Sequence, residues 1–159
     1  MEQPKRKKNR LQSYDYSQNG AYFITICTEN RKCLLASVVG ASLARPAHVR
    51  LTEWGQAVEQ AILRIPQCYP DVHLEKYVVM PNHIHLILEL HTKGLALSDI
   101  IGQYKSFVTR KIHGTEPFVR VWQASYHDHV IRNQRAYETI WLYIDSNAQN
   151  WEKDCFFAK

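Results

Sequence analysis

The sequence contains no long hydrophobic run. The longest weakly polar stretch, Leu35–Ala44, includes Ser and Gly and is far shorter than the roughly 20 apolar residues that a membrane-spanning helix needs. The basic N-terminus is followed by the polar segment 12–20, where a signal peptide would have an apolar core. These absences predict a cytoplasmic protein with no membrane partner.

Paired cysteines are also lacking. The sequence has no Cys-x-x-Cys pair and no zinc-ribbon spacing, so free thiols that act as small hydrophobic residues are expected. There is no internal repeat and no low-complexity block. A hydrophobic content of 45% with 22% charged residues is ordinary for a globular protein, and 159 residues suit one domain. The cysteines are Cys27, Cys33, Cys68 and Cys155.

The positive charge is concentrated at one end of the chain. Against 15 acidic residues there are 20 Lys and Arg, a net charge of +5. That excess equals the basic residues of a single N-terminal tail, so we divide the chain into a tail, residues 1–13, and one domain, residues 14–159. A basic tail favours a polyanionic partner through phosphate contacts and counterion release, but it is equally typical of a solvated segment that aids solubility. The residues are Lys5, Arg6, Lys7, Lys8 and Arg10.

The first half of the chain predicts a strand and then a helix. Aromatic and β-branched residues indicate a strand over Ala21–Thr28. Apolar residues at spacings of three and four predict a helix that begins after Thr52, a candidate N-cap, and ends at Pro66. Between them, residues 31–50 have no clean period and are expected to form a long connection or insertion.

The middle of the chain predicts two strands and a second helix. The strands cover Val72–Met80 and His83–Leu90, and a tight turn at Pro81-Asn82 joins them. The helix runs over about Ser98–His113 and ends at Gly114, with its apolar residues on one stripe.

The last part predicts a short strand and a third helix. The strand signal is best near Tyr126–Ile131, and Asn133 can cap a helix that extends to about Asn147, with Ile140 and Ile144 on its buried side. The order β-α-β-β-α-β is that of the ferredoxin-like split β-α-β fold. We therefore predict an α+β domain with an antiparallel sheet, two helices on one face and the last helix over the other.

The segment His83-Ile84-His85 is the first candidate site. Side chains two residues apart on a strand share a face, with Cβ atoms about 7 Å apart, so both imidazoles can reach one cation. The apolar residues between them would face the helices, which leaves the histidines on the opposite face. The alternative is a pair of hydrogen-bonded polar residues on a half-exposed strand.

Tyr143 and Asn147 are the second candidate. They are four residues apart and therefore lie on one side of the third helix. If that helix crosses the histidine face, Asn147 can provide an amide oxygen as a third metal ligand and Tyr143 a nucleophilic phenol. Tyr143 as an ordinary half-buried aromatic is the alternative, and Tyr126 is a weaker rival for the nucleophile.

With these residues in place, the sequence resembles the HUH endonucleases, and the residues that flank His83-Ile84-His85 resemble those of the REP-associated tyrosine transposases. The resemblance covers roughly residues 14–151 in ordered blocks. One departure is Ala148, where the family usually has proline after the asparagine; proline there would help to end the helix. The matching segments are Tyr14-Asp15-Tyr16, Tyr22–Ile26, Met80–Ile87, Val121-Trp122-Gln123, Tyr126–Asn133, Tyr143-Ile144, Asn147 and Trp151.

The resemblance implies a metal-dependent enzyme that cuts and rejoins single-stranded DNA near hairpins or palindromic repeats. Tyr143 would attack a phosphodiester, form a 5′-phosphotyrosine and release a 3′-hydroxyl, and the reverse attack would rejoin the strand. Mg²⁺ or Mn²⁺ would be held by His83, His85 and Asn147, and the protein would associate with the nucleoid. Candidate DNA-binding residues are the tail residues Lys5, Arg6, Lys7, Lys8 and Arg10, together with Lys105, Arg110, His129 and Arg132.

Other interpretations remain open at this point. A sheet of this topology is also a platform for RNA recognition, in which Tyr22, Tyr126 and the basic tail would be the functional features of a non-catalytic nucleic-acid-binding module. A metal-dependent hydrolase without a covalent step is a further alternative. The sequence is compatible with a monomer or with a homodimer that exchanges the last helix; the short link before Asn133 favours a helix that acts within its own chain.

Overall fold

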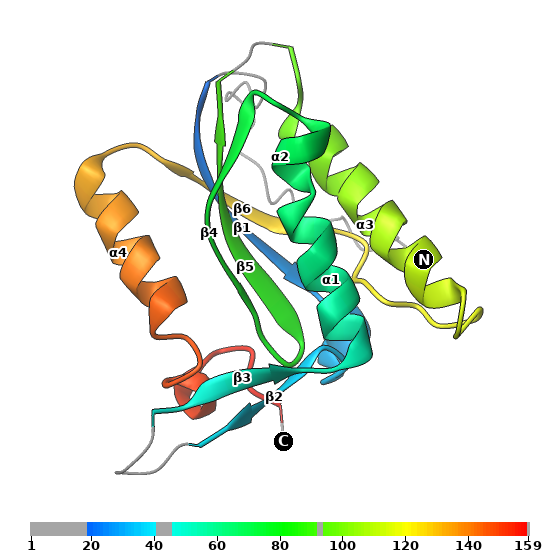
Figure 1. Ribbon diagram of the computed structural model, residues 1–159. Helices are drawn as coiled ribbons and strands as arrows, with labels where there is room; N and C mark the ends of the chain where they lie inside the picture. The colour runs from blue at the N-terminus through cyan, green and yellow to red at the C-terminus, as the bar shows by residue number, and fades with distance from the viewer. Residues whose placement is uncertain (1–18, 41–45, 92–93, 159) are drawn as a thin grey trace, which may run out of the picture.

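The computed structural model describes residues 19–40, 46–91 and 94–158 (Figure 1). The predicted tail, residues 1–13 with Lys5, Arg6, Lys7, Lys8 and Arg10, lies outside the described residues, as does the matching segment Tyr14-Asp15-Tyr16. Within the described ranges, no helix combines the length and apolar character needed to cross a membrane.

The core of the fold is a four-stranded antiparallel sheet. Its strands are β1 (Gly20–Cys27), β4 (Val72–Val79), β5 (His83–Leu90) and β6 (His127–Ile131), in the order β4-β5-β1-β6. The first and third strands of the predicted fold are therefore central, which is the ferredoxin-like arrangement, and this prediction is confirmed. The predicted turn at Pro81-Asn82 is closed by a hydrogen bond from Met80 N to His83 O.

Three helices cover one face of this sheet: α1 (Glu53–Leu63), α2 (Ile65–Cys68) and α3 (Leu97–His113) (Figure 1). The alternate residues of β5 that face them are at most 1% exposed and pack in one cluster with the apolar stripes of α1 and α3. Full burial of such a side chain stabilises the fold by about 1.5–3 kcal/mol. Because this face is apolar, the polar residues of β5 lie on the other face. The inward-facing residues of β5 are Ile84, Leu86, Leu88 and Leu90.

Both predicted helix caps are confirmed. Thr52 Oγ1 accepts a hydrogen bond from Gly55 N at 3.1 Å, and Asn133 Oδ1 accepts one from Ala136 N at 2.9 Å. Pro66, however, does not end the helical run. The chain bends at Arg64, and Pro66 lies in the first turn of the short α2, where its missing N–H group costs nothing.

The predicted long connection at residues 31–50 contains a second, two-stranded sheet, so that expectation was incomplete. Its strands are β2 (Ala36–Val39) and β3 (His48–Leu51). Each strand has four residues, which is too short for a period to stand out in the sequence. This sheet and the residue before it pack closely on α1, because a Cβ atom built on Gly55 would lie 1.9 Å from the Leu35 carbonyl oxygen and 3.2 Å from Cβ of Leu51 in β3.

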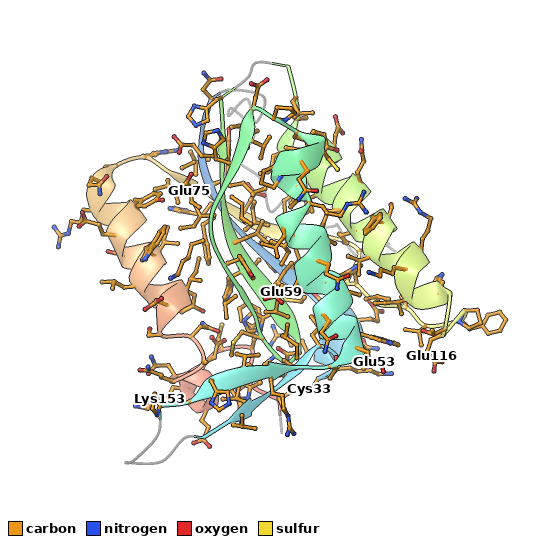
Figure 2. The ribbon with its side chains drawn as sticks, in the orientation of Figure 1. Cys33, Glu53, Glu59, Glu75, Glu116 and Lys153 are labelled. Atoms are coloured by element: carbon orange, nitrogen blue, oxygen red, sulfur yellow. The ribbon has the colours of Figure 1, made fainter. Side chains whose placement is uncertain are left out.

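The last helix, α4 (Gln134–Asp145), lies on the opposite side of the sheet from α1 and α3 and packs beside β4 (Figure 1). Tyr137 Oη donates to Glu75 Oε2 at 3.3 Å, which joins the helix to β4 at the position labelled in Figure 2. Of its two predicted inward residues, Ile144 is buried and Ile140 is half-buried. The helix ends at Asp145, slightly earlier than expected, and Asn147 lies in the turn that follows.

Two short 3-10 helices complete the fold. The first, η1 (Glu29–Arg31), follows β1, and both Asn30 and Arg31 have φ near +54°. The second, η2 (Trp151–Lys153), follows α4 and returns the C-terminal residues to the sheet (Figure 1). Both lie at the end of the sheet where β5 begins. Thr28, just before η1, donates its backbone N–H to the Asn82 carbonyl, and the Trp151 ring of η2 lies 6.0 Å from the His83 ring between centroids.

Candidate active site

The two histidines of β5 are buried on the sheet face opposite the helices. His83 is 0% exposed and His85 is 1% exposed, and their ring centroids are 4.5 Å apart. His83 Nδ1 lies 2.9 Å from Asn82 Oδ1, and His85 Nδ1 lies 2.8 Å from Thr25 Oγ1. These contacts orient each ring through Nδ1, so that both Nε2 atoms are available to a cation, as is usual for metal-binding histidines.

Burial keeps both imidazoles neutral. It lowers the pKa of His83 from 6.5 to about 4, and it lowers the pKa of His85 well below 6.5, with the neighbouring His83 as a second cause. A neutral imidazole presents the nitrogen lone pair that a metal ion requires. The pair is therefore already in the ligand-competent protonation state near pH 7.

Asn147 faces this pair from the turn after α4. Its side chain is 1% exposed, and its Oδ1 atom has no partner with hydrogen-bond geometry in the described part of the chain; the same is true of His83 Nε2. Buried polar atoms are nearly always paired, so two unpaired acceptors in one site indicate a missing partner. A divalent cation between them fits this donor set.

Asp154 is a fourth candidate ligand, which the sequence interpretation missed. One ligand atom each from His83, His85 and Asp154 lie within 4.8 Å of one another. Asp154 Oδ2 accepts a hydrogen bond from Asn147 Nδ2 at 3.1 Å, which brings the carboxylate and the amide together. Two imidazoles, an amide oxygen and a carboxylate form a mixed nitrogen and oxygen set suited to a divalent metal.

Tyr143 brings its hydroxyl group to the same point. Tyr143 Oη lies 3.3 Å from His85 Nε2 and donates to Asp154 Oδ2 at 3.2 Å. The side chain is 38% exposed, and its ring meets that of Phe23 edge to face. Burial, followed by the negative charge of Asp154, raises the pKa of Tyr143 to about 12. The phenol is thus protonated near pH 7 and in contact with a proton acceptor.

Three other tyrosines that could be considered for the nucleophile make different contacts. Tyr137 donates to Glu75, and Tyr104 belongs to the hydrophobic core at 5% exposure. Tyr126 packs as a half-buried residue against the core. Among the tyrosines that the structure describes, Tyr143 is the one that contacts both a histidine of the pair and Asp154.

The C-terminal residues cover the site. The Phe156 ring lies 4.6 Å from the His83 ring between centroids, and the Arg31 guanidinium lies 5.2 Å from the centre of the Phe156 ring. Asn82 Nδ2 donates to the Phe156 carbonyl at 2.8 Å, and Arg31 Nη1 donates to the Cys155 carbonyl at 3.2 Å. A substrate phosphate can reach the histidines only if this cover moves.

The predicted DNA-binding residues within the described chain are dispersed. Lys105 Nζ donates to the Gln123 carbonyl at 2.6 Å, and burial lowers its pKa, so its ammonium group is used within the protein. Arg110 is exposed on α3, and Arg132 is exposed just before α4. His129 is exposed on β6 and stands opposite Phe23, on the sheet face that carries the site.

Two known proteins are similar in sequence to most of this chain. A protein of Haemophilus influenzae strain Rd, itself uncharacterized, is 31% identical over 174 residues, which covers 96% of this chain and 93% of that protein. The REP-associated tyrosine transposase of Escherichia coli strain K12 is 24% identical over 140 residues, which covers 87% of this chain and 73% of the relative.

A solved structure and a family model complete the comparison. The structure of a REP-associated tyrosine transposase bound to a REP hairpin matches with a TM-score of 0.64 at 24% identity, over 87% of this chain and 72% of that one. Residues 17–147 match the family model described as "Transposase IS200 like". That span includes β1, the histidine pair, Tyr143 and Asn147. The chain therefore belongs to the IS200-like transposase family.

Proposed function

We propose that this protein is a metal-dependent single-strand DNA endonuclease and strand transferase that acts near DNA hairpins, with Tyr143 as its nucleophile. The observation that carries the proposal is the position of Tyr143 Oη, 3.3 Å from His85 Nε2 and 3.2 Å from Asp154 Oδ2. The proposed nucleophile is therefore in direct contact with a proton acceptor and with candidate metal ligands of the same chain.

In the proposed reaction, the Tyr143 oxygen attacks the phosphorus of a phosphodiester and its proton passes to Asp154. The Tyr143 O–P bond forms, the P–O3′ bond breaks, and the departing 3′-oxygen is protonated from solvent. The product is a 5′-phosphotyrosine and a free 3′-hydroxyl. Because the reverse attack by a 3′-hydroxyl restores the phosphodiester, rejoining needs no high-energy cofactor.

His83, His85, Asn147 and Asp154 would hold the cation, for which we propose Mg²⁺ or Mn²⁺. Such an ion would polarise a non-bridging phosphoryl oxygen and neutralise charge that develops during the attack. The two imidazoles are less suited to Mg²⁺, which prefers oxygen ligands, whereas the amide and the carboxylate supply such oxygens. Mn²⁺ accommodates the mixed set better.

We propose that the substrate approaches Tyr143, which is 38% exposed, from the side of β1 and β6. Thr25 and Phe23 of β1 stand opposite His127 and His129 of the edge strand β6. Directly opposed residues share a face, so these two exposed histidines lie on the site's face. We propose that His129, with Arg132 at the start of α4, contacts the cleaved strand.

The alternative of a non-catalytic RNA-recognition platform is less compatible with the side chains. Tyr22, one of the aromatics that would have to stack on bases, is 0% exposed and belongs to the core under the helices. Tyr126 is half-buried against the same core. The sheet face opposite α1–α3 instead carries the buried histidine pair.

The test uses labelled single-stranded hairpin DNA from beside the protein's own gene, incubated with the purified protein and Mn²⁺ or Mg²⁺, and then denaturing electrophoresis. A labelled protein–DNA adduct is expected, absent with a chelator and absent in Tyr143→Phe. Tyr137→Phe, a change of the same size on the same helix, is the matched control and should retain the adduct. Cleaved DNA without any adduct would favour the metal-dependent hydrolase. Binding without cleavage, in both metals, would favour the binding module.

A further inference from the structure

We propose that the loop 117–124 and the adjoining side of α3 bind unpaired nucleotides of the DNA substrate, with Phe118 stacking on a base and Arg110 and Arg120 contacting phosphates. This inference rests on the proposed function, because it identifies a surface that would hold part of the same DNA that is cleaved at Tyr143. None of these three residues belongs to the candidate metal or nucleophile set.

The surface is a hollow of about 600 Å³ between α3 and the loop. Basic residues contribute to its lining from both sides, and no acidic residue lines it. A concave surface with charge of one sign attracts a polyanion and raises its local concentration. The basic lining residues are Lys105, Arg110, His113 and Arg120.

Two of these basic residues fix the shape of the loop. His113 Nε2 lies 2.8 Å from the Val119 carbonyl oxygen near one end, and Lys105 Nζ donates to the Gln123 and Ala124 carbonyls at 2.6 and 3.3 Å at the other. The loop is therefore held at both ends by α3. Its conformation is fixed before any ligand arrives, which reduces the entropic cost of binding.

Phe118 lies near the start of this loop, next to the anchored Val119. Its side chain is 99% exposed, more than any other large hydrophobic residue in the described chain. The Phe118 ring contributes nothing to the core and lies on a surface lined by basic residues. Proteins that bind single-stranded DNA combine these two features: aromatic rings stack on the bases, and a positively charged groove binds the backbone. Stacking is sequence-tolerant because every base has a π-face.

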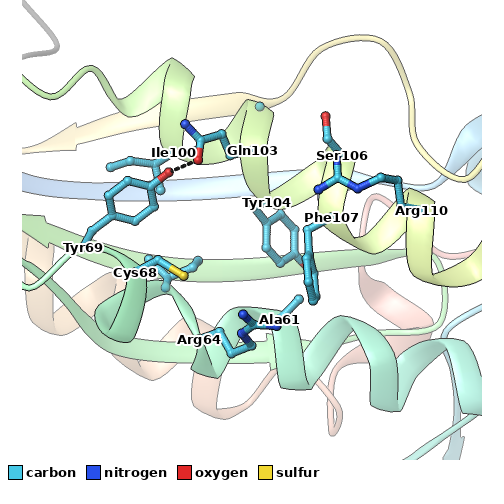
Figure 3. Close-up of a pocket in the computed structure, with 12 residues that line it drawn as sticks. Ala61, Arg64, Cys68, Tyr69, Ile100, Gln103, Tyr104, Ser106, Phe107 and Arg110 are labelled. Carbon is cyan, nitrogen blue, oxygen red and sulfur yellow. Dashed lines mark hydrogen bonds between the residues drawn. The ribbon is translucent and has the colours of Figure 1, made fainter.

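The two arginines are placed to accompany a stacked base. The Arg120 side chain is 71% exposed, and its contact with Glu29 Oε1 is long, at 3.6 Å. Arg110 is exposed on α3 and also lines a second hollow of about 480 Å³, between α2 and α3 (Figure 3). In that hollow, the Arg64 guanidinium lies 4.6 Å from the centre of the Phe107 ring.

The loop is also connected to the candidate active site. Glu29 N donates to the Val121 carbonyl at 2.9 Å, and Gln123 N donates to the Cys27 carbonyl at 3.0 Å. Cys27 stands opposite His83 in the β1–β5 ladder. Beyond residue 124 the chain enters β6, whose His127 and His129 share the face of the site. DNA held at Phe118 can therefore pass around the edge strand β6 to Tyr143.

The binding test uses fluorescein-labelled (dT)15 and fluorescence anisotropy, with chelator present so that no cleavage occurs. The background is Tyr143→Phe, so that loss of chemistry and loss of binding are measured separately. Phe118→Ala should weaken binding by about 5- to 100-fold, the range expected for one stacked base. Phe118→Trp should bind at least as well as the parent, whereas Phe118→Leu, which keeps an apolar side chain, should resemble Ala.

The arginines are tested by salt dependence. Removal of each by Arg110→Gln or Arg120→Gln should lower the slope of log affinity against log salt by about 0.7, the value for one single-strand phosphate contact. Leu63→Ala and Arg50→Gln, an exposed apolar residue and an exposed arginine outside this surface, are the controls and should change neither quantity.

Unchanged (dT)15 affinity in Phe118→Ala would overturn the inference, as would a parent protein that does not bind (dT)15. Equal binding by Phe118→Leu and the parent would also overturn it, because it would indicate an apolar contact such as a protein partner would make. These outcomes leave the adduct test of the proposed function untouched, since that test depends on Tyr143 and the metal.

Discussion

The Tyr143 hydroxyl group and the Asp154 carboxylate are in direct contact, with Oη and Oδ2 3.2 Å apart. The same Asp154 oxygen accepts a hydrogen bond from Asn147, and the carboxylate lies within reach of both site histidines. One side chain from the C-terminal segment thus joins the proposed nucleophile to the proposed metal ligands. Asp154 therefore belongs to the candidate site, although it lies in irregular chain.

The first prediction concerns metal affinity. Asp154→Asn keeps the side-chain size but removes the negative charge, so it should weaken Mn²⁺ binding by about 10- to 100-fold, the range typical of groups that support metal ligands. Electron paramagnetic resonance of free Mn²⁺, measured without DNA, checks this. Asp145→Asn is the matched control, because that carboxylate pairs with Lys76 on the α4–β4 side. Equal affinity in Asp154→Asn and wild type would remove Asp154 from the ligand set.

The second prediction concerns stability in acid. The folded-state pKa of His83 is about 4 and that of His85 is also lowered, against 6.5 for the free side chain. Between those values the unfolded chain binds protons that the folded chain does not, so stability is lost as pH falls below about 6.5 and is unaffected by these groups above it. Each histidine contributes a slope of about 1.4 kcal/mol per pH unit within the window.

Urea unfolding at pH 7, 6 and 5, without metal, measures this slope. His83→Gln should lower the slope of stability against pH by about 1.4 kcal/mol per pH unit within this window. The same steepness in wild type and His83→Gln would contradict a neutral, buried His83.

The third prediction concerns the C-terminal cover. The contact between the Phe156 and His83 rings must break for a phosphate to enter, and such aromatic contacts contribute about 0.5–1.5 kcal/mol. Phe156→Ala should therefore increase the rate at which diethyl pyrocarbonate modifies His83 and His85 by about 2- to 10-fold. Phe157→Ala is the control, because the Phe157 ring packs on Trp151 instead. No change in Phe156→Ala would mean that the ring does not limit access.

The fourth prediction concerns the packing of the second sheet on α1. A Cβ atom on Gly55 would lie 1.9 Å from the Leu35 backbone oxygen, whereas one on Gly102 would have nothing within 4 Å. Gly55→Ala should destabilise the protein by about 1–3 kcal/mol because backbone must move. Gly102→Ala, within α3, should stabilise it by about 0.5–1 kcal/mol. Thermal or urea unfolding compares the two, and equal effects would contradict this packing.

Regular elements account for most of what the sequence predicted correctly. Alternation along β5 placed His83 and His85 on one face because a strand has a fixed period of two. The spacing of four residues between Tyr143 and Asn147 predicted that their side chains lie on the same side. They do so although α4 ends at Asp145 and Asn147 lies in the turn that follows. Thr52 and Asn133 were identifiable as caps because a side-chain oxygen must meet the first free N–H groups.

What the sequence did not predict depends on tertiary contacts. Asp154 and Phe156 lie in irregular chain beyond α4, where no period indicates which way a side chain points. Lys105 was expected to face DNA because it lies on the polar side of its helix, but the 117–124 loop folds back to accept its hydrogen bonds. Phe118 carried no signal in sequence, since only a structure reveals that an aromatic residue is fully exposed.

The measurement that tests the central claim most directly is mass-spectrometric mapping of the covalent adduct. The protein is incubated with Mn²⁺ and hairpin DNA, the DNA is trimmed with nuclease, and the tryptic peptide 136–153, which contains both Tyr137 and Tyr143, is fragmented. The account predicts a nucleotide joined through its 5′-phosphate to Tyr143, with Tyr137 unmodified. A nucleotide on another residue, or a 3′-phosphate linkage, would contradict it.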